Sequence, residues 1–146
     1  MALACDFRVM AESAQLKQGF TGNALCIDAG GTFTLPRLVG LGRAMEIAAL
    51  DEPIDSHRAL DWGLVNEVVP DDALIDSARS LLSRVCEKSL HTFGWSKDLL
   101  NSSLETSLET QLAREREGLV ACVSHPDGIE GMQAFLDRRK AEFNQS

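Results

Sequence analysis

Tyrosine is absent from this chain, and aromatic residues of all kinds make up only 5% of it. Aliphatic residues and alanine therefore supply most of its apolar surface. The cysteines, Cys5, Cys26, Cys86 and Cys122, form no CxxC pair and no Cys/His spacing of the kind that holds a metal. This scatter argues against a metal site and fits reduced, partly buried thiols in a cytoplasmic protein.

Basic residues and long apolar runs are also scarce. The chain has 14 Lys and Arg against 22 Asp and Glu, which gives a net charge of -8. Nucleic acids and anionic membranes attract basic surfaces, so neither is expected as a partner. No stretch approaches the roughly 20 apolar residues that span a bilayer. The opening MALAC lacks the basic segment of a secretion signal, so the expected compartment is the cytoplasm.

The residues that are present suit one soluble globular domain, because 45% are hydrophobic and 25% are charged over a length of 146. The opening segment MALACDFRVMAE is unusual, since chain ends are commonly polar. It resembles the interior of a core, and few strands follow it to complete a sheet. We therefore expect that further residues precede this segment in the parent fold.

Periodicity predicts few strands early in the chain and many helices late in it. Alternation in Cys5–Met10 and in LVNEVVP predicts two short strands, with at most one more between them. The segment AGGTFTLPRLVG predicts a helix that ends near Gly40, and Pro36 favours a short helix or a kink. Further helices are predicted over GRAMEIAAL, DSHRALDWG, Leu74–Val85, Leu100–Leu119 and Ile129–Leu136.

Candidate N-caps precede several of these helices, because Asp and Ser side chains accept hydrogen bonds from the first backbone N–H groups. Gly63 follows DSHRALDW in the position suited to a left-handed residue. The candidate caps are Asp55 or Ser56, Asp71 or Asp72, and Asp127 with Glu130 in capping-box spacing.

Three stretches together resemble one family. They are ACDFRVMAESAQL, the long central segment DAGGTFTLPRLVGLGRAMEIAALDEPIDSHRALDWGLVNEVVP, and DGIEGMQAFLDRRKAEF. Each is similar to the matching segment of the crotonase superfamily, the enoyl-CoA hydratase/isomerase proteins, and the likeness runs from Ala2 to Phe143. The resemblance implies an α/β fold, a crotonase-like spiral of ββα turns, of which this chain matches only the second part. Residues 1–70 would complete the spiral core, and residues 71–146 would form a helical region used in trimerisation.

The resemblance also implies chemistry on acyl-CoA thioesters through an enolate. Two backbone N–H donors would hold the oxyanion, each worth roughly 10²–10³ in rate. Hydratase relatives use two glutamates, of which the first would align before Met1 and the second at Phe20. Phenylalanine cannot transfer a proton, so the sequence departs from the hydratase pattern. No cofactor is implied beyond the coenzyme A of the substrate, and no metal.

Asp28 stands at the position where isomerase and dehalogenase relatives place a catalytic aspartate. Two interpretations remain open for it. It is a base that moves a proton along the acyl chain, or it is a helix N-cap bonded to the backbone of Gly31 or Thr32. The glycines Gly30 and Gly31 suit a tight turn better than a phosphate-binding loop, because no GxGxxG or Walker pattern completes them.

The remaining candidates concern substrate binding. Phe20, Ala24 and Leu25 would line the acyl pocket. The resemblance places Lys140 near the coenzyme A phosphate and Phe135 near the adenine, with a solvated lysine and simple helix packing as the alternatives. The histidines His57, His91 and His125 share no spacing with one another and suit surface or cap positions.

Two functions from different classes follow. The first is an enzyme that isomerises an unsaturated acyl-CoA with Asp28 as base, forming a homo-oligomer such as a trimer or hexamer. The second is a catalytically inactive C-terminal half that acts as an assembly module or completes a separate N-terminal half.

Overall fold

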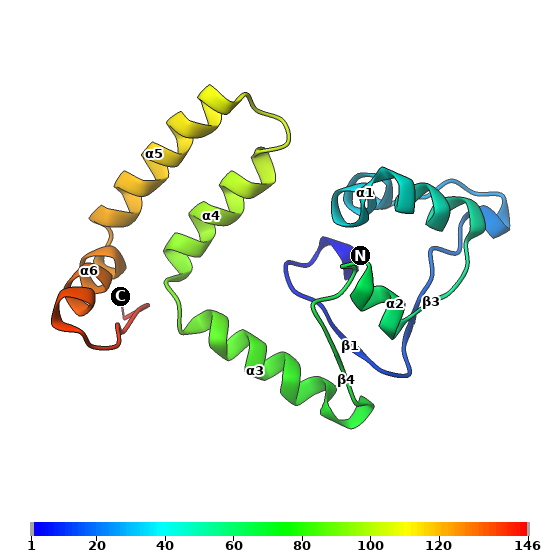
Figure 1. The fold of residues 1–146 in the computed structure, drawn as a ribbon, viewed down its shortest axis with the longest axis horizontal. Helices are drawn as coiled ribbons and strands as arrows, with labels where there is room; N and C mark the ends of the chain where they lie inside the picture. Colours follow the sequence, from blue (N-terminus) through cyan, green and yellow to red (C-terminus); the bar gives the residue numbers. More distant parts are fainter. Residues whose placement is uncertain (1, 146) are drawn as a thin grey trace. The chain divides into compact units, whose positions relative to one another are not determined.

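The computed structural model describes residues 2–145 (Figure 1). They divide into two compact units that meet between Arg79 and Ser80, inside helix α3 (Leu74–Cys86). The sequence suggested a division at residue 70, which would separate the strand-bearing part from the helical part. The unit before this boundary contains all the strands of the described chain, and the unit after it contains helices only.

The first unit alternates short strands with helices. This agrees with the predicted α/β class and with few strands early in the chain. In chain order its elements are η1 (Ala2–Ala4), β1 (Val9–Ala11), β2 (Gln15–Leu16), η2 (Thr21–Asn23), α1 (Gly31–Leu50), β3 (Ile54–Asp55), α2 (Ser56–Asp61), β4 (Glu67–Val69), η3 (Asp71–Ala73) and the start of α3.

The strands form a pair of two-stranded sheets. In the first, β1 runs parallel to β4, with Met10 opposite Val68 (Figure 1). In the second, β2 and β3 are antiparallel. The strand predicted from Cys5 is shorter than expected and begins at Val9, because the Arg8 N–H donates to the Asn66 side-chain oxygen (2.8 Å) instead of to a neighbouring strand.

Helix α1 contains a break at Gly40, where φ is 74° and ψ is 161°. Only glycine adopts these angles without strain, so the two short helices predicted on either side of Gly40 are confirmed as two segments of one bent element. Pro36 lies inside the first segment, and the break does not fall at the proline.

Helix α2 is capped as the sequence predicted. The Asp55 carboxylate accepts the Arg58 N–H (2.8 Å), and Gly63 after the helix has a φ of 73°. The N-cap predicted at Asp71 or Asp72 was wrong, because both residues lie inside η3, which has Pro70 at its N-cap. The Asp71 carboxylate instead accepts the backbone N–H (3.1 Å) and the hydroxyl of Ser13, a long-range pair that local pattern does not reveal.

The core of the first unit is one buried cluster that combines side chains from both segments of α1 with side chains from β1, β3 and α2. Burial of one leucine-sized side chain stabilises a fold by about 1.5–3 kcal/mol, so this cluster is the main source of the unit's stability. Its buried side chains are those of Met10, Leu35, Ala44, Ile47, Ile54, Ala59, Leu64 and Val65.

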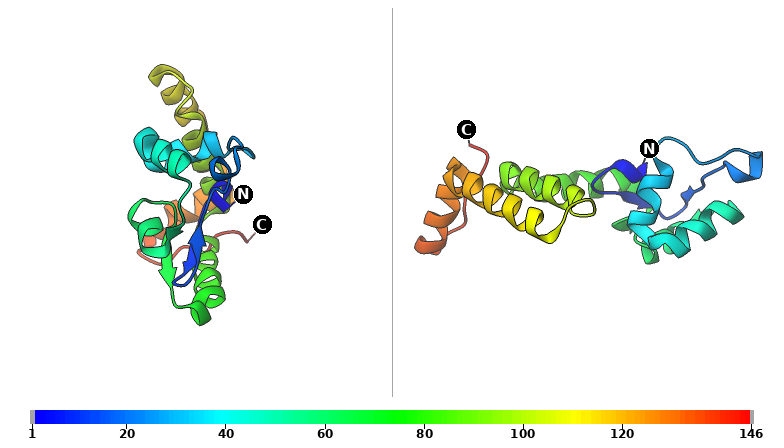
Figure 2. Two further views of the ribbon diagram at one scale, coloured as in Figure 1. Left: turned by 90° about the vertical axis from the view of Figure 1, so that its right-hand side faces the viewer. Right: turned by 90° about the horizontal axis from the view of Figure 1, so that it is seen from above.

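The second unit is built from the end of α3, α4 (Leu90–Ser102), α5 (Leu108–Ser124) and α6 (Pro126–Asp137). Helices α4 and α5 pack side by side (Figure 2). The single helix predicted over Leu100–Leu119 was wrong, because the chain turns between α4 and α5. Ser107 ends this turn as the N-cap of α5 and accepts the Thr110 N–H, although the leucine spacing continues across it.

Helix α6 begins on a histidine. The His125 Nδ1 accepts the Asp127 N–H (3.2 Å), which confirms a cap role for this histidine. The capping box predicted for Asp127 and Glu130 was wrong. The Asp127 carboxylate accepts the Asn144 N–H (2.9 Å), and the Glu130 carboxylate binds Arg139 (2.6 Å).

No helix within residues 2–145 is long and apolar enough to cross a membrane. The cysteines are all free, and Cys122 alone is partly buried. The expectation of partly buried thiols therefore holds for Cys122 and was wrong for Cys5, Cys26 and Cys86, which are exposed.

Candidate functional site

A cavity of about 270 Å³ lies in the first unit, between the loop that precedes α1 and the core. Its walls are mainly apolar, and a single carboxylate, that of Asp28, is among its described lining residues. Phe20 lines the same cavity, so the structure brings together two of the predicted site residues. The apolar lining comes mainly from Leu3, Leu16, Leu35, Ile47, Ile54 and Leu64, and Lys17 and Gln18 complete the rim.

Asp28 lies at the turn that leads into α1. The Gly31 N–H donates to the Asp28 backbone carbonyl (2.8 Å), and Ala29 and Gly30 both have positive φ, 50° and 75°. The N-cap of α1 is Gly30, and within residues 2–145 no side chain caps this helix. Asp28 is therefore not the N-cap of α1. Within the described residues no backbone N–H of α1 donates to the Asp28 carboxylate, and its side chain is exposed at the cavity.

Phe20 lies at the start of η2 in a loop that the sequence analysis did not recognise as ordered. The loop is held by Asp51, whose carboxylate accepts the Gly19 N–H (2.7 Å) and the Gly22 N–H (2.9 Å). The N–H groups of Gly22 and Gly19 lower the pKa of Asp51 below its ordinary value. The sequence shows only that an aspartate follows the helix. It does not show that Asp51 is buried, so its contact with the Phe20 loop could not be predicted.

Ala24 and Leu25, which were predicted to line the acyl pocket, are not among the residues that line this cavity. Ala24 ends η2 in a left-handed conformation (φ 57°), and the Leu25 N–H donates back to the Phe20 carbonyl (3.0 Å). This turn leaves the Leu25 side chain 61% exposed. Their part in substrate binding therefore stays a prediction without support from the geometry of the cavity.

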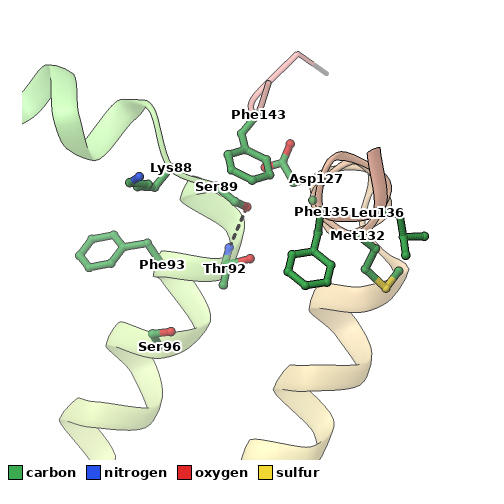
Figure 3. A pocket seen from close by; sticks show the side chains of 12 residues that line it. Lys88, Ser89, Thr92, Phe93, Ser96, Asp127, Met132, Phe135, Leu136 and Phe143 are labelled. Atoms are coloured by element: carbon green, nitrogen blue, oxygen red, sulfur yellow. Dashed lines mark hydrogen bonds between the residues drawn. The ribbon is translucent and has the colours of Figure 1, made fainter. Parts of the chain in front are cut away.

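An open apolar groove of about 740 Å³ lies in the second unit, between α4, α6 and the C-terminal segment (Figure 3). Phe135 and Met132 on α6 and Phe143 from the C-terminal segment line it. Phe135 is 82% exposed, so it is not a residue of helix packing, and its role beside an adenine stays a prediction. Lys140, the other predicted coenzyme A residue, binds Glu87 (3.1 Å).

Polar groups close one end of this groove. Asp127 is buried there, and the Ser89 hydroxyl, followed by the Asn144 N–H, lowers its pKa. His91 stacks on His125, with ring centroids 3.9 Å apart and planes 5° from parallel. Together these contacts join the start of α4 to the start of α6, whereas His57 is exposed on α2.

A metal site does not form among these groups: within residues 2–145, no cluster of three or more His, Cys, Asp or Glu side chains is placed to hold an ion.

Comparison with known proteins identifies what this fold is. A family model described as enoyl-CoA hydratase/isomerase matches residues 1–146. The chain belongs to the enoyl-CoA hydratase/isomerase family. The resemblance stated from the three sequence stretches is thereby confirmed, from the first of them to the last.

Two curated members of the enoyl-CoA hydratase/isomerase family illustrate its range. The chain is 34% identical over 143 residues to the crotonyl-CoA hydratase of Syntrophomonas wolfei and to the 1,2-epoxyphenylacetyl-CoA isomerase of Escherichia coli. Each match covers 98% of this chain and 55% of the relative. The chain thus spans about half the length of the curated relatives it matches, and these relatives include both hydratases and isomerases by name.

Solved structures similar to this chain confirm the fold class. An enoyl-CoA hydratase from Bacillus anthracis superposes with a TM-score of 0.91 at 33% identity, covering 99% of this chain and 56% of the other. DspI of Pseudomonas aeruginosa superposes with a TM-score of 0.89 at 34% identity. The predicted α/β class, with few short strands and a mostly helical C-terminal region, is therefore confirmed.

Proposed function

We propose that the protein containing this chain isomerises an unsaturated acyl-CoA, with Asp28 moving the proton. The observation that carries the proposal is the cavity whose described lining contains one acidic residue, Asp28, together with apolar residues and Phe20. Membership of the enoyl-CoA hydratase/isomerase family supports an acyl-CoA thioester as the substrate class.

Isomerisation needs one group that both takes and returns a proton. With a 3-enoyl-CoA, a carboxylate beside the acyl chain removes a proton from C2, and the electron pair of the C–H bond moves into the thioester carbonyl to give a dienolate. The dienolate then takes the proton back at C4, so the double bond moves to C2–C3 and nothing is added. Asp28 has the chemistry for both steps. Hydration needs a second proton-transfer group to activate water, and Phe20 cannot serve as one.

Removal of water from around a carboxylate strengthens it as a base. In the described chain Asp28 is exposed and lines the cavity. Leu35 on α1 and Leu64 after α2 form part of the apolar wall of this cavity. A bound acyl chain would fill the space between these walls and exclude water from the carboxylate. Lys140 and Phe135 are proposed to contact the coenzyme A part of the substrate, through its phosphate and adenine.

A second function is favoured by one observation on the helical unit. Large apolar side chains lie exposed along α5 and α6, among them Leu112, Leu119 and Phe135. Such a surface suits contact with another polypeptide. The alternative is therefore an assembly or complementation module without catalysis of its own, in which the same surface binds a second copy or a separate N-terminal half. A cytoplasmic homo-oligomer is compatible with either function.

The proposal is tested by Asp28→Asn in the protein that contains this chain, with Asp61→Asn at an exposed aspartate of α2 as the matched control. Loss of a positioned general base lowers kcat by about 10²–10⁴-fold. We expect this loss for Asp28→Asn on a short 3-enoyl-CoA, with an unchanged melting temperature, and no loss for Asp61→Asn. Hydration of crotonyl-CoA should be absent in all three proteins.

An unchanged kcat in Asp28→Asn would show that Asp28 is not the base and would contradict the proposal. If the unsubstituted protein turns over no enoyl-CoA at all, the enzyme proposal fails and the assembly function takes its place. Efficient hydration of crotonyl-CoA would contradict the role assigned to Phe20.

A further inference from the structure

The carboxylate of Asp51 is buried, although it lies at the end of α1 and follows an exposed leucine. Its residue is 7% exposed, whereas Leu50 is 59% exposed. Both carboxylate oxygens are used: Oδ1 accepts the Gly19 N–H (2.7 Å) and Oδ2 accepts the Gly22 N–H (2.9 Å). Hydrogen bonds from N–H groups to a charged carboxylate are shorter and stronger than neutral ones. Asp51 therefore anchors a loop that lies far from it in the sequence.

The backbone of Asp51 is suited to this task. Its φ is 50° and its ψ is 34°, the left-handed conformation in which helices commonly end on glycine or asparagine. The Asp51 N–H donates to the Ile47 carbonyl (3.1 Å), so the turn is fixed to α1. Glycine would fit this conformation more easily but would have no side chain to reach the loop. The aspartate at this position supplies the carboxylate that contacts the loop.

The anchored loop carries Phe20 between the two bound amides. Its geometry is closed from within as well, because the Asn23 N–H donates to the Phe20 carbonyl (2.9 Å) and the Asn23 side chain donates to the Gly19 carbonyl (2.8 Å). Close contact completes the arrangement, since a Cβ added at Gly22 would lie 3.1 Å from the Asp51 carboxylate. The loop is therefore closed by its own hydrogen bonds, and Asp51 joins it to the end of α1.

Asp51 also lies between two residues of the opposite cavity wall. Ile47 lies one turn before it on α1, and Ile54 lies on β3 just after it, and both are buried. Ile47, Ile54 and Phe20 all line the 270 Å³ cavity. The carboxylate therefore joins the wall formed by α1 and β3 to the wall formed by the Phe20 loop.

We propose that Asp51 is a positioning residue that fixes Phe20 against the α1–β3 wall and thereby restricts the cavity to short acyl chains. This inference rests on the proposed acyl-CoA function. Release of the loop would let Phe20 move outward and deepen the cavity. One additional methylene in an apolar pocket changes discrimination by about 10-fold or more, so a modest movement of Phe20 should be measurable.

The test uses Asp51→Asn, Asp51→Gly and, as the matched control, Glu52→Gln at the exposed neighbouring residue. Asp51→Asn keeps the size of the side chain but leaves one oxygen for two N–H donors, and Asp51→Gly keeps the left-handed turn without any acceptor. Hydrogen exchange is measured at the Gly19 and Gly22 amides. Binding of saturated butanoyl-CoA and octanoyl-CoA is measured by calorimetry, which requires no catalysis.

We expect both Asp51 variants to lose exchange protection at Gly19 and Gly22 and to shift the binding ratio about tenfold towards octanoyl-CoA, with Glu52→Gln unchanged. Retained protection, or lost protection with an unchanged ratio, overturns the assignment. If the unsubstituted protein binds neither acyl-CoA, the proposed function fails together with the chain-length role. The exchange data then still decide whether Asp51 anchors the loop.

Discussion

The Asn144 side chain joins segments that are distant in sequence. Its Oδ1 accepts the Leu90 N–H (3.0 Å), and its Nδ2 donates to the carbonyls of Cys86 (2.9 Å) and Lys88 (2.8 Å). Its own N–H donates to Asp127. It therefore fixes the C-terminal segment to the turn between α3 and α4, beside the groove of the helical unit.

Asn144→Ala should destabilise the helical unit by about 1–3 kcal/mol, because several net hydrogen bonds of about 0.5–1.5 kcal/mol each are lost. Asn144→Gly should cost about the same, although glycine suits the φ of 61° at this position. Urea unfolding of both variants beside Gln145→Ala checks this. If Asn144→Gly were as stable as the unsubstituted chain, the side-chain hydrogen bonds would contribute nothing to stability. The positive φ would then be the property of Asn144 that matters at this position.

Glu130 and Arg139 form a two-bond ion pair, with distances of 2.6 and 2.9 Å. The Arg139 side chain, and after it the Glu142 N–H, lowers the pKa of Glu130 to about 2. A carboxyl whose pKa is lower in the folded than in the unfolded state stabilises the fold above its unfolded pKa, which is 4.5 here. That stabilisation is lost as the pH falls from 4.5 towards 2.

Glu130→Gln should therefore flatten the pH dependence of stability between about pH 4.5 and 2, since the variant has no proton to bind in this range. Melting temperatures measured across that interval test the expectation, with Glu115→Gln on the exposed part of α5 as the control. Parallel curves for Glu130→Gln and the unsubstituted protein would contradict it.

At the scale of the elements, α4 and α5 meet through a glycine. A Cβ added at Gly118 on α5 would lie 2.9 Å from the Trp95 ring on α4, whereas nothing lies within 4 Å of a Cβ added at Gly94 on α4. The two positions therefore allow the same substitution to be compared in a tight and an open environment.

Gly118→Ala should destabilise the unit by about 1–3 kcal/mol, because the added methyl group forces Trp95 to move. Gly94→Ala should stabilise it by up to about 1 kcal/mol, because alanine favours a helix more than glycine does. Chemical unfolding followed by far-ultraviolet circular dichroism measures both. The packing described for α4 and α5 would be contradicted if Gly118→Ala were as stable as Gly94→Ala.

Elements with local signals could be predicted from the sequence, and those decided by distant partners could not. Asp55 and Gly63 mark the ends of α2 through contacts within a few residues, so both were recognised. Asp71 and Asp127 resemble N-caps equally well in the sequence. In the structure, however, the Asp71 carboxylate accepts the Ser13 N–H and the Asp127 carboxylate accepts the Asn144 N–H. Phe20 and Asp28 were predicted as site residues from the family resemblance, and both line the cavity. The contact between Asp51 and the loop of Phe20 could not be predicted, because the two segments are distant in sequence and meet only in the fold.

At the scale of the whole molecule, many large apolar side chains are exposed to solvent, and contact with another polypeptide would bury them. Those on the helical unit include Leu100 and Leu104 near the turn between α4 and α5, and Phe135 and Leu136 on α6. In addition, β1 belongs to a sheet of only two strands and so has an unpaired edge. Both features favour association with another chain.

The purified 146-residue chain should accordingly not be a stable monomer. Sedimentation at micromolar concentration is expected to give species heavier than the chain mass of 15.9 kDa. Leu136→Glu, on the exposed part of α6, should weaken this association because it introduces a charge into the apolar surface. A compact monomer at that concentration would contradict the expectation.

The cap at the start of α6 also fixes the tautomer of His125. A ring nitrogen that accepts the Asp127 N–H cannot carry a proton, so the neutral imidazole must hold its hydrogen on Nε2. This hydrogen bond joins the imidazole ring to the first turn of the helix that bears Phe135. The nitrogen chemical shifts of His125 therefore report directly on whether the start of α6, and with it one wall of the groove, is formed.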